Sequence, residues 1–377
     1  RSPSRSRSVS LTALAPGKWC VMTTQSIDQQ KAQAFAGQLL GILNAGLVNL
    51  MISVGHRTGL FDKMAAMPPS TTEQIASATG INERYVREGL GSLVVARVVE
   101  YDPGAKTYHL PPEHAAFLTR AAGPNNMATM TQFTALFGQV EDQVVHAFRN
   151  GGGVPYSSFG TFQTLMAEES AQVVDATLIP VTLPLTGIVD RLESGIDVLD
   201  VGCGKGHAIN VMAREYPNSR FTGYDFSAEG VAAGNAEAKD WGLKNSKFAS
   251  KDVSTLDDAA AYDLITAFDS IHDQAQPTRV LANIARALRP GGVFLMVDIA
   301  ASSNLEENAQ HPLGAALYAI STMHCMTVSL ALNGEGLGTC WGTQLALQKL
   351  AEAGFVNVEI KRVEGDILNA YYVARKD

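Results

Sequence analysis

The chain has 377 residues, 46% of them apolar, which is enough for two domains with their own cores. Its net charge of −8 argues against a surface that coats nucleic acid, so we expect no nucleic-acid partner. The cysteines have neither disulfide nor metal spacing, which predicts free thiols in a reducing, cytoplasmic compartment and no metal site. They are Cys20, Cys203, Cys325 and Cys340.

The first residues differ in composition from the rest of the chain. Residues 1–21 hold four positive charges and no acid, a bias that also occurs in transit peptides. We expect residues 1–24 to be a disordered tail, with Met22 as the natural beginning. The remainder is then more acidic than the whole chain.

A mostly apolar helix is predicted over residues 28–57. The stretch from Leu39 to Val54 is the only membrane-like segment, but Asn44 and Asn49 interrupt it. It is also shorter than the ~20 residues that span a bilayer. We therefore expect no membrane partner, and interpret this helix as buried at a subunit interface.

A winged helix is predicted within residues 25–115. Helix-capping patterns precede two short helices, one ending at Gly80 and one covering residues 83–93. Residues 98–101 and 106–110 flank a turn and predict a hairpin. A winged helix that reads DNA carries Lys and Arg along its second helix, whereas here Arg84 and Arg87 alternate with Glu83 and Glu88. A DNA-binding regulator remains an alternative.

The run VLDVGCGKG at 198–206 has the pattern of a buried strand that breaks into a glycine-rich turn before a helix. Such a turn lets a ligand approach the backbone, and the acid at the end of the next strand, Asp225, can hold a ribose diol. Further strands are predicted to end near Lys251 and at Asp269. The run ALRPGG at 287–292 then ends a helix and leads into a strand at 293–298.

These motifs, with GYDFS at 223–227 and KDV at 251–253, resemble those of class I S-adenosylmethionine-dependent methyltransferases. A nicotinamide dehydrogenase is the alternative, but its fingerprint is Gly-x-Gly-x-x-Gly, and its pyrophosphate disfavours a carboxylate such as Asp200 beside the turn. A similar sheet that has lost its ligand is a further alternative. The resemblance implies an α/β fold: a Rossmann-like seven-stranded sheet in residues 191–377, after a mainly helical winged-helix domain.

The resemblance also implies a cofactor site for S-adenosylmethionine, with S-adenosylhomocysteine as product. Acidic neighbours suit its amino group and sulfonium. Asp225 is expected to bind the ribose hydroxyls, Phe226 to flank the adenine, and Asp252 and Val253 to face it. The other expected cofactor-binding residues are Asp200, Gly202, Cys203, Gly204, Gly206, Phe268 and Asp269.

Small-molecule O-methyltransferases of the caffeate and hydroxyindole type carry a winged-helix dimerisation module before the catalytic domain. Similarity to this family implies a homodimer and a small-molecule acceptor. It also implies that a helical connector, residues 116–190, contributes to the acceptor pocket. The expected contacts there are Tyr156, Phe162 and Met166.

In the same family, a His-Asp pair after the fourth strand supplies the general base, which here corresponds to His272 and Asp273. A histidine with pKa near 6.5 can take the proton of a phenol as the methyl transfers. We expect His272 at the pocket mouth; alternatively it caps a helix. Family members place a supporting Glu where this chain has Cys340-Trp341-Gly342, and the nearest acid is Glu335.

Residues 299–342 are long for a connector and predict a lid insertion. Within it, Tyr318, Met323 and His324 are candidate acceptor contacts, with His324 as a second possible base; alternatively they only fill a core. The predicted function is transfer of a methyl group to an apolar or aromatic small molecule, at oxygen. Transfer to nitrogen or carbon, favoured by the missing Glu, and an S-adenosylmethionine-responsive DNA-binding regulator remain alternatives.

Overall fold

The computed structural model describes residues 27–377, so the predictions for the tail, for Met22 and for Cys20 lie outside the described part. The chain divides into two compact units, one up to Ala45 and one from Gly46 to Asp377. The first contains, among described residues, the start of helix α1 (Gln29–Arg57), which matches the predicted helix.

Helix α1 is apolar but exposed along its first half. Phe35, Leu40 and Leu43 are each more than half exposed. By length and composition, α1 and the helical segment Gly314–Ala331 are both apolar enough to cross a membrane. The expectation of a single short membrane-like segment was therefore wrong, because α1 extends well beyond residues 39–54 and a second segment exists. The second is partly buried, as a core helix would be.

The predicted winged helix is confirmed. Thr71 and Gln74 form a capping box at the start of α3, and the Asn82 side chain accepts a hydrogen bond from the Arg84 backbone N–H (3.0 Å) at the start of α4. Ile75 and Leu90 pack into its small core. Its elements are α2 (Leu60–Ala65), α3 (Thr72–Thr79), α4 (Glu83–Val95), and the hairpin β1 (Glu100–Asp102) and β2 (Thr107–His109).

Helices continue from the hairpin to the seven-stranded sheet. Helix α8 is the longest of them and lies along the edge of the pocket described below. The elements of this stretch are α5 (Pro112–Leu118), η1 (Arg120–Asn125), α6 (Gln132–Gly138), α7 (Glu141–Asn150), η2 (Tyr156–Ser158), α8 (Phe162–Thr177), η3 (Leu178–Thr182), η4 (Leu183–Thr186) and α9 (Val189–Ser194).

The seven-stranded sheet has the order β5-β4-β3-β6-β7-β9-β8, which confirms the predicted Rossmann-like fold. Strands β3 to β7 pair in parallel, and β9 runs antiparallel to both of its neighbours. The strands are β3 (Asp197–Val201), β4 (Arg220–Asp225), β5 (Ser246–Ser250), β6 (Tyr262–Phe268), β7 (Leu288–Ile299), β8 (Val358–Lys361) and β9 (Asn369–Arg375).

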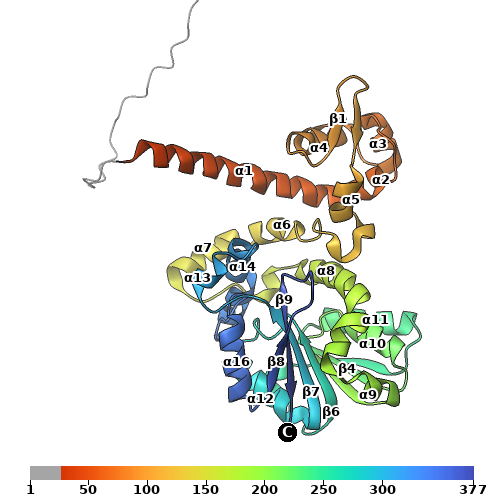
Figure 1. Cartoon of the computed structure of the whole chain (residues 1–377), viewed down its shortest axis with the longest axis vertical. Helices are drawn as coiled ribbons and strands as arrows, with labels where there is room; N and C mark the ends of the chain where they lie inside the picture. The colour runs from red at the N-terminus through yellow and green to blue at the C-terminus, as the bar shows by residue number, and fades with distance from the viewer. Residues whose placement is uncertain (1–26) are drawn as a thin grey trace, which may run out of the picture. The chain divides into compact units, whose positions relative to one another are not determined.

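Helices cover both faces of this sheet (Figure 1). Because side chains alternate along a strand, Leu199 packs in the core beneath α12 (Pro277–Ala287) and α16 (Gly342–Glu352), whereas Val198 packs on the opposite face with α10 (His207–Glu215). Helix α11 (Ala228–Asp240) covers β5. The chain passes from β3 outward through β4 and β5, then returns to β6 on the other side of β3. Ligands bind at the strand ends beside such a switch point.

The lid insertion forms a nearly continuous helical segment. It comprises α13 (Leu305–Asn308), α14 (Gly314–Ile320), a π-helical turn η6 (Ser321–Cys325) and α15 (Met326–Ala331). A short helical turn, η5 (Val253–Thr255), follows β5. The lid brings His324 and Cys325 beside the end of β6, where the pocket lies.

Candidate active site

The turn after β3 is packed so tightly that only glycine fits at two positions. Gly202 and Gly206 have φ of 74° and 76°. A Cβ on Gly202 would lie 2.5 Å from the Ser270 Cβ, and one on Gly206 2.3 Å from the Phe248 ring. The backbone N–H of Gly202 donates to the Tyr224 carbonyl (2.8 Å), which ties the turn to β4. The turn is therefore a rigid floor that leaves room for a ligand above the backbone.

Asp225 ends β4 and is held by this turn. Its two carboxylate oxygens accept hydrogen bonds from the backbone N–H groups of Gly204 and Ser227, each at 2.8 Å. The side chain is 6% exposed, and burial raises its pKa. A carboxylate oxygen can accept more than one hydrogen bond, so Asp225 can still bind a pair of ligand hydroxyls.

Two further buried acids lie at the ends of β3 and β6. Burial raises the pKa of Asp200 to about 7, although the Thr266 hydroxyl donates a 2.7 Å hydrogen bond to it. Burial, with the negative charge of Asp298, raises the pKa of Asp269 to about 8. One oxygen of Asp269 is buried without a hydrogen-bond partner. These acids are buried beside the glycine turn and have no cationic partner among the described residues. Such a site suits a ligand that carries a positive charge.

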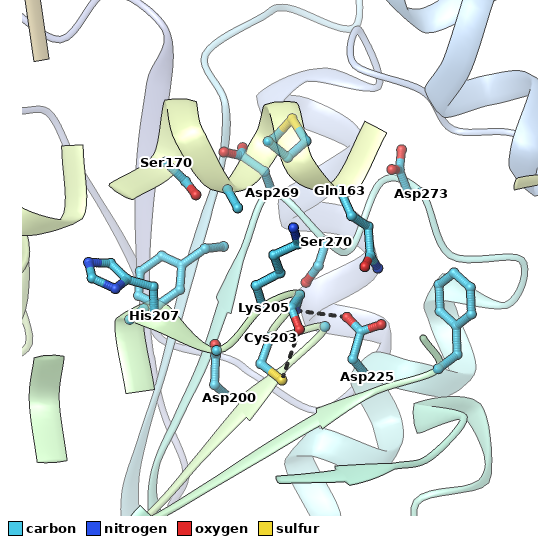
Figure 2. A pocket seen from close by; sticks show the side chains of 18 of the residues that line it. Gln163, Ser170, Asp200, Cys203, Lys205, His207, Asp225, Asp269, Ser270 and Asp273 are labelled. Atoms are coloured by element: carbon cyan, nitrogen blue, oxygen red, sulfur yellow. Dashed lines mark hydrogen bonds between the residues drawn. The ribbon is translucent and has the colours of Figure 1, made fainter. Parts of the chain in front are cut away.

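All the expected cofactor residues line one pocket at the carboxyl ends of these strands (Figure 2). Of the expected acceptor contacts, Tyr156, Phe162 and Met166 line the same pocket. Their roles in binding stay predictions. Sequence reasoning missed other lining residues, among them Gln163 and Ser170 of α8, Lys205, His207, Lys251 and Ser270.

The other three expected acceptor contacts are not among the residues that line the pocket. His324 is fully buried and stacks on Phe162, with ring centroids 3.6 Å apart. Met323 packs against the cluster that includes Phe133, and the Tyr318 hydroxyl accepts a hydrogen bond from Asn308 (3.0 Å). Burial lowers the pKa of His324 to about 4, so its ring is neutral. His324 thus supports the pocket wall at Phe162 without lining the pocket.

His272 was expected at the pocket mouth, and that expectation was wrong. It is 3% exposed, and its Nδ1 faces Asp298 Oδ1 at 2.8 Å. Its Nε2 lies 3.3 Å from Asp273 Oδ1, and Asp273, not His272, lines the pocket. Burial alone lowers the pKa of His272, but the charges of Asp298 and Asp273 outweigh it and raise that pKa well above its usual value.

Sequence reasoning missed Asp298, the partner that fixes His272. Its Oδ1 also accepts hydrogen bonds from the Trp341 indole (3.1 Å) and the Ile299 backbone N–H (2.8 Å). In the sequence it stood only as the acid that ends the predicted strand at 293–298. Trp341, in the stretch where the family has Glu, thus donates a hydrogen bond to the Asp298 carboxylate. Glu335 instead pairs with Lys349 on α16.

A metal-type cluster exists among residues 27–377, where ligand atoms of His272, Asp273 and Cys325 lie within 4.8 Å of one another. Burial raises the pKa of Cys325 to about 12, and His272 is held in its protonated form by carboxylates. A metal at this cluster would have to displace protons from both groups. The absence of a metal site stays a prediction.

This sheet order, its reversed last hairpin and an acidic pocket over a glycine turn define the class I methyltransferase fold. Comparison with known families agrees. Residues 192–361 match the family described as methyltransferase domain, and residues 46–120 match the Rv2258c-like winged HTH domain. The chain thus carries a methyltransferase domain after a winged-helix domain.

Curated relatives match in part of their length. A ubiquinone biosynthesis O-methyltransferase of Cronobacter sakazakii is 34% identical over 125 residues, 33% of this chain and 48% of that protein. An S-adenosyl-L-methionine-dependent Diels-Alderase of Talaromyces variabilis is 27% identical over 185 residues, 47% of this chain and 59% of that protein. The chain thus spans about half the length of these relatives.

Solved structures match over most of both chains. A candidate O-methyltransferase from Nostoc punctiforme PCC 73102 has a TM-score of 0.70 at 18% identity, covering 90% of this chain and 98% of that one. Human N-acetylserotonin methyltransferase, in complex with S-adenosylmethionine, has a TM-score of 0.63 at 19% identity, covering 94% and 99%. At these identities the likeness shows the shared fold.

The raised pKa values predict pH-dependent cofactor affinity. Asp200 and Asp269, with pKa values of about 7 and about 8, are protonated at lower pH and attract a cationic ligand only when ionised. Affinity for S-adenosylmethionine should therefore rise with pH through this range, and binding should release protons because the ligand's positive charge favours ionised acids.

Isothermal titration calorimetry in two buffers of different ionisation enthalpy measures both effects. Asp200→Asn, which cannot ionise, should weaken the pH dependence. Affinity that stays constant across the same range, with no proton release, would contradict the assignment of these acids to the cofactor.

Proposed function

We propose that the protein transfers a methyl group from S-adenosylmethionine to an apolar or aromatic small molecule, at oxygen. The observation that carries this proposal is the acidic pocket of Asp200, Asp225 and Asp269 above the glycine turn. When bound, S-adenosylmethionine supplies a methyl group activated by its sulfonium sulfur. The pocket acids suit the positive charges of this cofactor, and Asp225 suits its ribose hydroxyls.

The acceptor would enter beside Tyr156, Phe162 and Met166, which give the pocket an apolar, aromatic side. The Tyr156 and Phe226 rings meet edge to face at 5.0 Å, so the aromatic side continues to the expected adenine position. Burial raises the pKa of Tyr156, which keeps its phenol neutral. Such a surface favours a planar apolar acceptor that the enzyme aligns with the methyl group.

His272 and Asp273 are proposed as the catalytic pair, with Asp273 as the member that faces the acceptor. His272 lies between the carboxyl groups of Asp273 and Asp298, which raise its pKa. The Asp273 carboxylate can accept the acceptor's hydroxyl proton as the methyl group transfers. His272 keeps Asp273 in place, and Asp298 keeps His272 in its orientation.

Transfer to nitrogen or carbon remains the second candidate, because the family's supporting Glu is absent here. A DNA-binding regulator is less well supported. Arg84 and Arg87 of α4 pair with Glu88 (2.5 Å) and Glu83 (2.6 Å) on the same helix, so their charges are partly neutralised. We also propose a cytoplasmic location, in line with the free thiols of the described cysteines.

Asp225→Asn tests the cofactor site. Removing a charged acceptor should weaken S-adenosylhomocysteine binding by about ten- to hundredfold, the usual value of a charge-assisted hydrogen bond. Calorimetry measures the affinity, and thermal melting checks that the variant folds. Exposed Asp240→Asn is the control and should bind as the wild type does. Equal affinity of the Asp225 variant and the control would reject the site.

His272→Ala tests the catalytic pair. Loss of acid–base assistance should reduce the transfer rate by about 10²- to 10⁴-fold, while S-adenosylhomocysteine affinity stays unchanged. Glu335→Gln is the matched control and should keep full activity, because its carboxylate pairs with Lys349. Full activity of His272→Ala, and a pH–rate profile without an ionising group, would instead favour transfer to nitrogen or carbon.

The exposed apolar side of α1 supports a homodimer. Light scattering should give twice the 40.1 kDa mass of one chain. Leu40→Asp, at a position 61% exposed, should shift the mass toward one chain without changing the fold. A wild-type monomer that sediments with lipid vesicles would contradict the dimer and assign α1 to a membrane surface.

A further inference from the structure

Glu168 of α8 does not line the pocket but is the centre of a charged cluster. Its Oε1 lies 2.9 Å from the His56 Nε2 and 3.2 Å from the Arg120 guanidinium. Its Oε2 accepts a hydrogen bond from the Gln132 amide at 3.1 Å. These partners come from the end of α1, from η1 and from the start of α6. Three elements that precede α8 in the chain therefore meet at one of its side chains.

The cluster holds Glu168 as a carboxylate and in a fixed place. The His56 side chain has no exposure, and its Nε2–H donates to the carboxylate. Burial tends to raise the pKa of Glu168. Hydrogen bonds from Gln132 and His56, together with the charge of Arg120, outweigh burial and lower that pKa. Arg120 is itself held by Asp62 of α2, through its backbone N–H (2.8 Å) and its guanidinium (2.6 Å). The carboxylate thus binds partners that cannot follow α8 if this helix moves.

Helix α8 also supplies one wall of the pocket. Gln163, Met166, Ala167 and Ser170 line it, and Figure 2 shows Gln163 and Ser170 on the side of this helix that faces the strands. Glu168 lies between these lining residues in the chain, yet no residue of α8 is fully buried. A helix without fully buried side chains gains little from the hydrophobic core. A charge-assisted contact near its middle therefore contributes a large share of what fixes its position.

Polar contacts also join α8 to the sheet. Gln163 accepts a hydrogen bond from the Ser227 hydroxyl after β4 (3.1 Å), and Asp175 lies 3.0 Å from the His207 ring at the start of α10. The helix is thus held between the sheet and the cluster around Glu168. Because a helix moves as a unit, any shift in its position moves all of its lining residues together. The width of the pocket therefore depends on both sets of contacts.

We propose that Glu168 is a positioning residue of the pocket. Its contacts with His56 and Arg120 fix α8 at the distance from the sheet at which Met166 and Ser170 complete the wall. This inference rests on the proposed function, because it takes the pocket as the S-adenosylmethionine site. Glu168 acts on ligand affinity through α8 and takes no part in proton transfer. The end of α1 thereby influences a site that it does not line.

Glu168→Gln in the full-length protein tests the proposal, because it keeps the side-chain size and removes the charge. Calorimetry should show S-adenosylhomocysteine binding weakened about two- to thirtyfold, as is usual for residues that act on a site without contacting its ligand. Hydrogen exchange should become faster in α8 of the free variant and stay unchanged in β3 and β6. In a protein that already carries Arg120→Met, Glu168→Gln should have a smaller effect, because both changes remove one contact.

Asp62→Asn is the matched control. It removes the other carboxylate partner of Arg120, at nearly the same side-chain exposure as Glu168, 31% against 32%, but from α2 instead of α8. It should leave S-adenosylhomocysteine affinity and exchange in α8 as in the wild type. Equal weakening of binding by both variants would overturn the proposal and assign the cluster to general stability. Unchanged affinity of Glu168→Gln, with or without faster exchange, would also overturn it.

Gln132→Met covers the case in which Glu168→Gln does not fold. It removes one neutral donor to Glu168 and should weaken binding in the same direction by a smaller factor. Unchanged affinity of this variant would then overturn the proposal. Failure of the wild type to bind S-adenosylhomocysteine would instead reject the proposed function.

Discussion

The site depends on the close packing of the turn after β3. Gly202 lies against Ser270 and Gly206 against Phe248, so the backbone of the turn cannot move without disturbing β6 and β5. This packing directs the Gly204 N–H at Asp225 and fixes that carboxylate in the pocket. The turn also carries Lys205, which donates a hydrogen bond to Thr164 of α8. One backbone constraint thus places Asp225 in the pocket and ties the turn to α8.

Behind the pocket, buried charged groups contact one another. Asp298 has no exposure, and it accepts hydrogen bonds from three donors at one oxygen, including His272 and Trp341. A buried carboxylate is costly unless it is paired, so the cationic form of His272 and the carboxylate stabilise each other. Of this buried cluster, Asp273 is the acid that lines the pocket. A proton acceptor at Asp273, held in place by His272, is consistent with a histidine that does not itself line the pocket.

Local patterns were sufficient to predict the sheet, the winged helix and the cofactor pocket. Each signal lay within a short stretch, such as the strand and turn at 198–206 or the capping residues Thr71 and Asn82. Contacts between distant segments were not predictable in this way. The positions of His272 and His324 depend on how the lid packs on β7, and Asp298 looked like an ordinary strand end until Trp341 and His272 were seen beside it.

The most direct test of the account is transfer of label from methyl-labelled S-adenosylmethionine into a fractionated cell extract by the purified full-length protein. The account predicts label in the small organic fraction, lost with His272→Ala and with Asp225→Asn. Label in nucleic acid or protein would contradict the proposed acceptor class. Absence of transfer to any fraction, despite measurable cofactor binding, would contradict the proposed methyl transfer.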